Sequence, residues 1–245
     1  FSSSQWPVVT LKNNQPGDFE RFYPTTIMET AYDILMFWVM RMLMMGLYST
    51  QQLPFKKVYL HGLIRDSKGQ KMSKSKGNVI NPLEIDALRM AIVIRSSAGL
   101  DKTLSEADFQ AMRNLNNKLW NAARFILLQK ENQAITDQNT AKLDKKFTKN
   151  LEKIVLAVSR NLDQLQLGLA ADTLYNEFWH WFCDQCIEDA KKGLISQEKL
   201  FDGLVIFLKL FQPFIPFVTE SIWQILYQEQ LVAEPLLMTS RWPSC

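Results

Sequence analysis

The pattern of apolar residues changes near residue 85 and divides the chain into two parts that require different folds. Upstream, a dense apolar stretch over residues 30–48 predicts a helix packed on most sides, and residues 58–60 predict a short buried strand. A lysine-rich loop follows, which is the order expected at the carboxyl edge of a parallel sheet. Beyond Gly99 no convincing strand pattern remains, so the sequence predicts an α/β segment over residues 1–84 and an α-helical bundle over residues 85–245.

Turn and capping residues divide the second part into helices. Ser105 stands three residues before Asp108, a spacing that favours the start of a helix. Residues 132–140 are mostly polar and predict a surface loop, and Pro213 and Pro216 predict a break within an apolar helical pattern. The expected helices cover residues 105–130, 143–166, 169–193 and 198–228.

The overall charge does not identify a partner. A net charge of +3 over 245 residues is too small to indicate a nucleic-acid binder by itself, and 47% hydrophobic content allows each part its own core. Any RNA contact must therefore come from local patches. One such patch surrounds the single acid Asp66 and contains Lys56, Lys57, Arg65, Lys68, Lys71, Lys74 and Lys76.

Membrane and secretory signals are not found in the sequence. The most apolar stretch, residues 34–48, is interrupted by Arg41 and is shorter than the roughly 20 residues that a bilayer-spanning helix needs. Residues 1–7 carry neither a basic leader nor an apolar core. Three cysteines in a chain of this size do not form a disulfide framework, so we expect a cytoplasmic protein without a membrane partner.

Cys183 and Cys186 form a single Cys-x-x-Cys pair with His180 nearby, which raises the question of zinc. Structural zinc sites normally take four ligands from separated clusters, and this segment reads as one continuous helix without a second pair. We therefore expect two reduced helical thiols, no zinc and no other metal ligands.

A short loop between Gly69 and Gly77 carries the most specific chemical signal. Its two ammonium groups stand three positions apart among hydroxyl side chains, and glycines allow a close approach of the backbone to an anion. Such a loop suits a polyphosphate, although a solvated basic loop is the simpler alternative. The loop residues are Lys71, Met72, Ser73, Lys74 and Ser75.

The order of these residues resembles the second nucleotide-binding signature of class I aminoacyl-tRNA synthetases, including its spacing from His61 and Gly62. Within that class the chain most resembles the valyl-tRNA synthetases, and the resemblance covers nearly its whole length. Further similar segments are residues 32–38, 41–48, 117–125 and 213–217. The resemblance implies that the first part is the C-terminal portion of a Rossmann-like catalytic domain and the second an anticodon-binding domain.

The reaction implied by the resemblance forms an aminoacyl adenylate from valine and ATP, with Mg²⁺ as counter-ion, and pyrophosphate leaves. Lys71 and Lys74 are the candidate catalytic residues, because ammonium groups that meet the charge on departing pyrophosphate lower the barrier. The candidate ATP-binding residues are His61, Gly62, Lys71, Met72, Ser73, Lys74 and Ser75. His61 could equally be structural, and Met72 is expected to anchor the loop by packing rather than to touch the substrate.

Asp33 and Trp38 resemble family positions that line the aminoacyl pocket, where an acid holds the ammonium group and an aromatic wall holds a small aliphatic side chain. Without the resemblance, Trp38 would be assigned to the core. An unpaired buried carboxylate is costly, so Asp33 could instead cap the helix or pair with Arg41.

A polar face on the helix expected at residues 105–130 is the candidate tRNA-binding surface. At about 100° per residue, Arg113, Asn117 and Arg124 align, with Asn121 beside them. Asparagines are poor choices for helix stability, whereas amides can contact base edges and arginines can contact phosphates. A solvated polar face or interhelical hydrogen bonds would also explain the pattern.

The sequence therefore predicts a fragment of a valine–tRNA ligase that contributes the ATP loop and binds tRNA(Val), with no role in DNA binding. No His-Ile-Gly-His-type signature occurs in the 245 residues, so this segment alone is expected to be inactive. The alternative is a non-catalytic, synthetase-derived module that binds tRNA or another partner.

Overall fold

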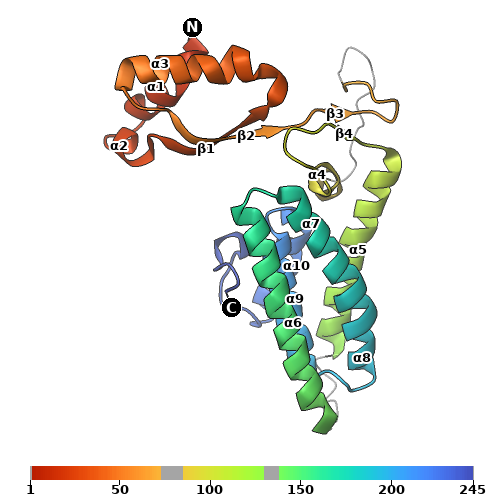
Figure 1. The fold of residues 1–245 in the computed structure, drawn as a ribbon. Coiled ribbons are helices and arrows are strands. Elements are labelled where there is room, and N and C mark those ends of the chain that lie inside the picture. The colour runs from red at the N-terminus through yellow and green to blue at the C-terminus, as the bar shows by residue number, and fades with distance from the viewer. Residues whose placement is uncertain (1, 73–84, 130–137, 245) are drawn as a thin grey trace. The chain divides into compact units, whose positions relative to one another are not determined.

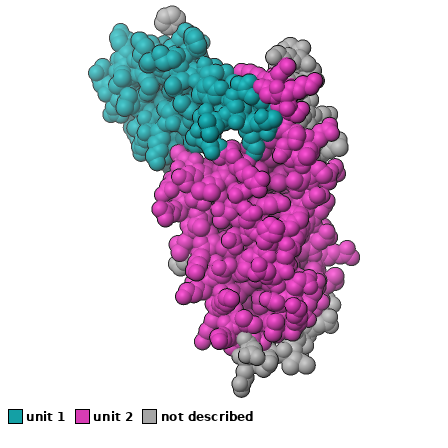
Figure 2. Space-filling view, turned by 45° about the vertical axis from the view of Figure 1, so that its right-hand side comes forward, with its two compact units in different colours: residues 1–65, 97–103 teal, residues 66–96, 104–245 magenta. Residues whose placement is uncertain are grey.

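A computed structural model describes residues 2–72, 85–129 and 138–244 (Figure 1). The chain divides into two compact units, which Figure 2 shows in different colours. The first unit combines residues 1–65 with 97–103, and the second combines residues 66–96 with 104–245. The first is a small α/β unit and the second is helical, as the sequence predicts.

The α/β unit is built around a β-α-β crossover. Strand β1 (Thr25–Ala31) pairs in parallel with β2 (Phe55–His61), and helix α3 (Met40–Thr50) connects them and lies along the pair (Figure 1). Two short helices, α1 (Trp6–Asn13) and α2 (Asp18–Phe22), precede β1. The core consists of Val39, Met42 and Phe55, with Met28, Leu35, Trp38 and Leu43 packed against it.

The helix predicted over residues 30–48 is partly wrong. The chain continues as β1 to Ala31, forms a 3-10 turn at Tyr32–Ile34 and a π-helical segment at Leu35–Val39, and becomes α-helical only at Met40. Three threonines and one isoleucine among the seven residues of β1 favour a strand, and the apolar density of the following segment concealed this boundary.

Two further strand predictions need correction. The expected strand at residues 58–60 exists within β2, but it is not buried: Val58 is 37% exposed, and Tyr59 and Leu60 are half-buried. A strand also occurs beyond Gly99, because β4 (Lys102–Thr103) pairs in parallel with β3 (Ile64–Arg65). A strand of two residues is too short to produce a periodic pattern in the sequence.

The second unit is a bundle of helices. Asp108 Oδ2 accepts hydrogen bonds from the backbone N–H of Ser105 at 2.8 Å and from its hydroxyl at 2.6 Å, so the predicted start of the long helix is confirmed. Pro216 is the first residue of the last long helix. A backbone N–H at this position has no partner within the helix, so proline, which lacks the N–H, is tolerated there. The helices are α4 (Ile85–Val93), α5 (Glu106–Gln129), α6 (Gln138–Asp163), α7 (Leu167–Asn176), a π-helical segment (Glu177–Cys186), α8 (Ile187–Lys191), α9 (Gln197–Phe211) and α10 (Pro216–Gln228).

The bundle core is an aromatic cluster where the π-helical segment meets α9. Phe178 contacts Phe207 and Phe211 edge to face at centroid distances of 5.3 and 5.4 Å, and all three side chains are fully buried. Gly203 allows this approach, because a Cβ there would lie 2.6 Å from a ring atom of Phe182. The cluster packs the π-helical segment against α9, and α5 and α10 pack against α9 in turn.

The helix predictions in this unit are largely confirmed, with shifted ends. The break between α9 and α10 falls at the predicted prolines. The loop expected at residues 132–140 lies mostly outside the described residues, but α6 already includes residues 138–140. The proposed boundary between residues 84 and 85 stays a prediction. Of the helices in the described residues, none has the length and apolar character needed to cross a membrane.

Candidate functional site

The end of strand β2 holds the first candidate ATP-binding residues. His61 is the last residue of β2, and its ring is about half exposed. Its Nε2 lies 3.3 Å from Glu29 Oε1, and its Nδ1 lies 2.8 Å from the carbonyl oxygen of Gly62. Both ring nitrogens therefore face oxygen atoms of the chain itself, which orients the ring at the carboxyl end of the strand.

Gly62 has a structural requirement of its own. A Cβ at this position would lie 1.7 Å from the carbonyl oxygen of Leu100, and the backbone N–H of Lys102 donates a 3.0 Å hydrogen bond to the carbonyl of Leu63. The absence of a side chain lets residues 99–102 pack beside the turn after β2. This packing explains the glycine, and the predicted contact with ATP remains untested.

The entry to the lysine loop is organised by Asp66. Its Oδ1 accepts hydrogen bonds from the backbone N–H groups of Lys68, at 3.0 Å, and Gln70, at 2.8 Å. Gly69 completes this turn with a φ of 75°, a conformation that favours glycine. Lys71 leaves the turn exposed and Met72 is half-buried. Ser73, Lys74 and Ser75 lie outside the described residues, so the arrangement of the two lysines stays a prediction.

The two candidate pocket residues differ in their surroundings. Asp33 is exposed on the 3-10 turn, so the buried carboxylate considered from the apolar sequence is wrong. Trp38 packs against the core of the α/β unit and stacks on Trp6 with ring centroids 6.1 Å apart. Its contacts fit the core interpretation, and the proposed contact of either residue with valine is untested.

Helix α5 presents the predicted polar face. Asn117, Asn121 and Arg124 are exposed and Arg113 is half-buried. The opposite face is buried as predicted and consists of Met112, Leu115, Leu119, Ala122 and Ile126. The structure thus brings the four candidate tRNA-binding residues together on one side of one helix.

Trp120 belongs to the same face and was missed by the sequence analysis. It is 42% exposed and stands seven residues after Arg113 and three after Asn117, so the same helical spacing could have identified it. Asn116 also behaves differently from its neighbours. It is only 8% exposed, and its Oδ1 is buried without a hydrogen-bond partner.

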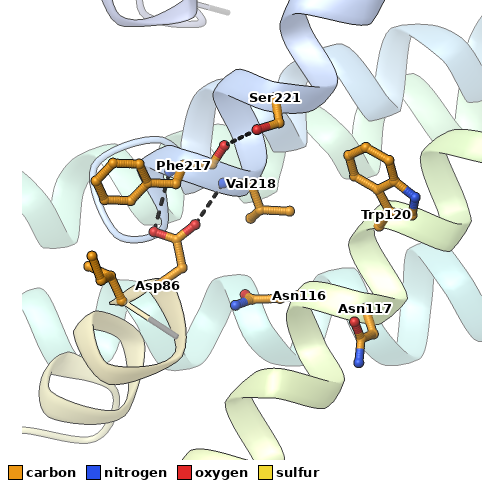
Figure 3. Close-up of a pocket in the computed structure, with 8 residues that line it drawn as sticks. Asp86, Asn116, Asn117, Trp120, Phe217, Val218 and Ser221 are labelled. Carbon is orange, nitrogen blue, oxygen red and sulfur yellow. Dashed lines mark hydrogen bonds between the residues drawn. The ribbon is translucent and has the colours of Figure 1, made fainter. Parts of the chain in front are cut away.

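Two pockets lie between α5 and α10, and Trp120 lines both of them. The first has a volume of about 510 Å³ (Figure 3), and the second, an apolar pocket that Arg124 also lines, has a volume of about 420 Å³. Asp86 of α4 closes the first pocket and accepts hydrogen bonds from the backbone N–H groups of Phe217, at 3.3 Å, and Val218, at 2.7 Å. This pocket is lined by Asp86, Asn116, Asn117, Trp120, Phe217 and Ser221, together with Ile85 and Val218.

The cysteine pair lies inside the π-helical segment and away from solvent. Burial raises the pKa of both Cys183 and Cys186 to about 12, so neither is a thiolate at neutral pH. His180 is exposed, with Nδ1 3.5 Å from Asp184 Oδ2. Within the described residues, no group of three or more His, Cys, Asp and Glu side chains could hold a metal ion.

Two family models together match the whole chain. Residues 1–150 match the family of class I tRNA synthetases (I, L, M and V), and residues 144–245 match the anticodon-binding domain of tRNA ligases. The chain therefore belongs to the class I tRNA synthetases.

Several similar curated proteins are valine–tRNA ligases. The chain is 40% identical over 261 residues to that of Dehalococcoides mccartyi (strain CBDB1), which covers 100% of this chain and 30% of that protein. It is 39% identical over 257 residues to that of Thermotoga maritima and 36% identical over 263 residues to that of Clostridium tetani, covering 99% of this chain in both cases and 29% of each protein. The chain thus spans about 30% of the length of these relatives.

Solved structures show the same fold at low sequence identity. The ternary complex of Agrobacterium radiobacter K84 agnB2 LeuRS with tRNA and LeuAMS superposes with a TM-score of 0.80 at 18% identity, covering 99% of this chain and 32% of that chain. Methionyl-tRNA synthetase of Mycobacterium tuberculosis, in complex with methionyl-adenylate, gives a TM-score of 0.64 at 20% identity, covering 87% of this chain and 46% of that chain.

Proposed function

We propose that this chain is the part of a valine–tRNA ligase that carries the ATP loop and binds tRNA(Val) through its helical bundle. The observation that carries the proposal is the exposed face of α5, because it gathers arginine, asparagine and tryptophan side chains in a helical unit whose residues 144–245 match anticodon-binding domains. Arginines bind phosphates, amides read base edges, and an exposed indole stacks on unpaired bases.

The proposed chemistry of the α/β unit is adenylate formation from valine and ATP, with Mg²⁺ accompanying the nucleotide. His61 and Gly62 would lie beside ATP, while Lys71 and Lys74, supported by Met72, Ser73 and Ser75, would meet the charge that develops on pyrophosphate. Such contacts accelerate the reaction only if they are stronger in the transition state than in bound ATP. Asp33 and Trp38 would hold the ammonium group and side chain of valine.

The 245 residues alone are proposed to be inactive, because they contain no His-Ile-Gly-His-type signature to bind the rest of ATP. ATP–pyrophosphate exchange with valine should be undetectable with this chain. Clear turnover would contradict the proposal that the segment supplies only one part of the active site.

Binding of tRNA tests the role of α5. An Arg113→Ala, Asn117→Ala double variant should bind a tRNA(Val) transcript at least about 10-fold more weakly, and its affinity should depend less steeply on salt because a phosphate contact is lost. Arg160→Ala is a matched control, since Arg160 is an exposed arginine on α6. Equal binding by the double variant and the control would refute this surface.

The alternative function is a non-catalytic module that binds tRNA. The lysine loop separates the two possibilities when the chain is combined with a polypeptide carrying the other ATP signature. Exchange that appears in the mixture and is lost in a Lys71→Ala, Lys74→Ala variant would support the ligase. Specific tRNA binding with no exchange in the mixture would favour the module.

A further inference from the structure

We propose that Asp101 is a positioning residue for adenylate formation, whose carboxylate fastens the turn at His61–Leu63 to Tyr32, the residue before the candidate pocket residue Asp33. The proposal rests on the ligase function proposed above. It adds a residue that would touch neither substrate but would hold the two segments that do. Asp101 was missed by the sequence analysis and lies in the α/β unit together with residues 1–65.

The first argument is the place of Asp101 at the edge of the sheet. Strands β1 and β2 are parallel and end side by side, with Ala31 paired to His61. The segments that follow them leave the sheet at its carboxyl edge, where open α/β folds bind their ligands. Asp101 Oδ2 accepts a hydrogen bond from the hydroxyl of Tyr32 at 3.3 Å, and Oδ1 accepts one from the backbone N–H of Leu63 at 2.8 Å. One carboxylate thus joins the segments that leave both strands.

The second argument is that the carboxylate of Asp101 is already occupied. Oδ2 also accepts a hydrogen bond from Nε of Arg65, so three donors from the described residues share its two oxygen atoms. The N–H of Leu63 does most to lower the pKa of Asp101, and Arg65 and Tyr32 lower it further, so the group is ionised at neutral pH. The guanidinium of Arg65 compensates this charge. Asp101 is therefore suited to hold other residues in place rather than to act as a base.

The third argument is that the backbone around Asp101 is held against the same turn. The N–H of Gly99 donates a 2.8 Å hydrogen bond to the carbonyl oxygen of Leu60, and the N–H of Lys102 donates a 3.0 Å hydrogen bond to that of Leu63. Asp101 therefore stands on a segment that is fixed on both sides to β2 and the turn after it. Positioning of this kind matters for the rate, because a shift of about 1 Å in a group that contacts substrate can cost up to about 100-fold.

Kinetics of the whole chain, combined with a polypeptide that carries the other ATP signature, test this role. Asp101→Asn keeps the shape of the side chain but loses its charge and the acceptor for Arg65. Counted per active site, kcat/KM for ATP in ATP–pyrophosphate exchange should fall about 10-fold or more. Asp18→Asn is the matched control, because Asp18 is another carboxylate of the α/β unit and accepts a hydrogen bond from the nearby side chain of Asn14. The control should change the same constant by less than about 2-fold.

A double-mutant cycle separates positioning from a loss of folded protein. His61→Ala should slow the exchange reaction, and it should cost less in the Asp101→Asn background because the turn is already displaced. A purely structural Asp101 would change only the number of active sites, which the burst of adenylate counts, and the cost of His61→Ala would stay the same. An unchanged cost, or a His61→Ala variant with full activity, would overturn the positioning role.

Amide hydrogen exchange tests the contacts without turnover. In Asp101→Ala the amide of Leu63 should exchange about 10-fold faster or more because its acceptor is lost, while the amide of Met42, in the core of the same unit, should keep its protection. An equal rise at Met42 would mean that the whole unit opens, which would refute a local role.

The unmodified mixture distinguishes the two proposals. If it shows no ATP–pyrophosphate exchange, the proposed ligase function fails and the role of Asp101 fails with it. If it is active and Asp101→Asn is equally active per site, the role of Asp101 alone is overturned.

Discussion

The carboxylate of Asp86 accepts a 2.7 Å hydrogen bond from the backbone N–H of Val218 and so joins α4 to the start of α10. From the same helix, Arg89 donates to the carbonyl oxygens of Phe214, at 3.1 Å, and Pro213, at 2.9 Å. Two charged side chains of α4 thus form hydrogen bonds with the backbone at opposite ends of the turn between α9 and α10. Arg89 donates to carbonyl oxygens, and Asp86 accepts from N–H groups. This turn is held by side chains more than 120 residues away in the sequence.

Replacing Asp86 should therefore destabilise the helical unit. Asp86→Ala leaves two backbone N–H groups at the helix start without their acceptor, which should lower the free energy of unfolding by about 2 kcal/mol. Urea denaturation followed by circular dichroism measures the loss. Asp202→Ala is the comparison, because its ion pair with Lys199 is partly exposed and should contribute at most about 1 kcal/mol. Equal losses in the two variants would contradict the capping role.

Gly62→Ala should destabilise the α/β unit by at least about 3 kcal/mol, because the new methyl group would overlap the carbonyl of Leu100. Gly17→Ala is a suitable control in the same unit. Gly17 has a φ of 92° and no atom within 4 Å of a built Cβ, so only backbone strain of about 1–2 kcal/mol is expected. Denaturation of both variants gives the comparison, and a milder effect at Gly62 would argue against the close approach.

The ion pair between Lys118 and Asp184 should be visible in the titration of the carboxyl group. Lys118 Nζ lies 2.7 Å from Asp184 Oδ1 and 3.9 Å from the ring centroid of Trp179. The hydrogen bond from Lys118 lowers the pKa of Asp184 below its usual 3.8, with a smaller contribution from His180. Because the folded-state pKa is depressed, the stabilisation is present above pH 3.8 and is lost as pH falls through the folded-state value.

Lys118→Met should consequently raise the pKa of Asp184, which carboxyl-resolved NMR can follow. The accompanying loss of stability at pH 7 should be about 0.5 kcal/mol or less, because both groups are solvent-accessible. His180→Gln is the control and should move the same titration less. A larger shift in the control would contradict the order of these contributions.

The sequence predicted the helices better than the strands for a physical reason. Capping and helical spacing are local, so Ser105 and Pro216 identify the starts of α5 and α10 without knowledge of the fold. Strand β1 is stabilised by pairing with β2 about 30 residues away, and its sequence runs directly into an apolar helix. The π-helical segments are only 5 and 10 residues long and run directly into α-helices, so they are too short for their different spacing to appear in the sequence pattern.

At the candidate site, too, the sequence pattern predicted features of one helix but not contacts between distant segments. Helical spacing correctly placed Asn117 and Arg124 on an exposed face, and it should have included Trp120. It could not show that Asn116, one residue earlier, turns its amide into a pocket, because that burial depends on α10. Likewise, the need for glycine at residue 62 comes from Leu100, which is distant in the sequence.

The buried thiols of Cys183 and Cys186 give a prediction about reactivity and alkaline stability. Their pKa of about 12 means that almost no thiolate exists at pH 8, so in a Cys245→Ser variant neither should react with a thiol reagent before the chain unfolds. Both should react once denaturant is added, which provides the control. Their folded-state pKa lies above the ordinary value of 9.0, so their stabilising contribution is complete below pH 9 and is lost as pH rises towards 12. Rapid labelling of either thiol in the native chain at pH 8, or a melting temperature that does not fall between pH 9 and 12, would contradict their burial among the helices.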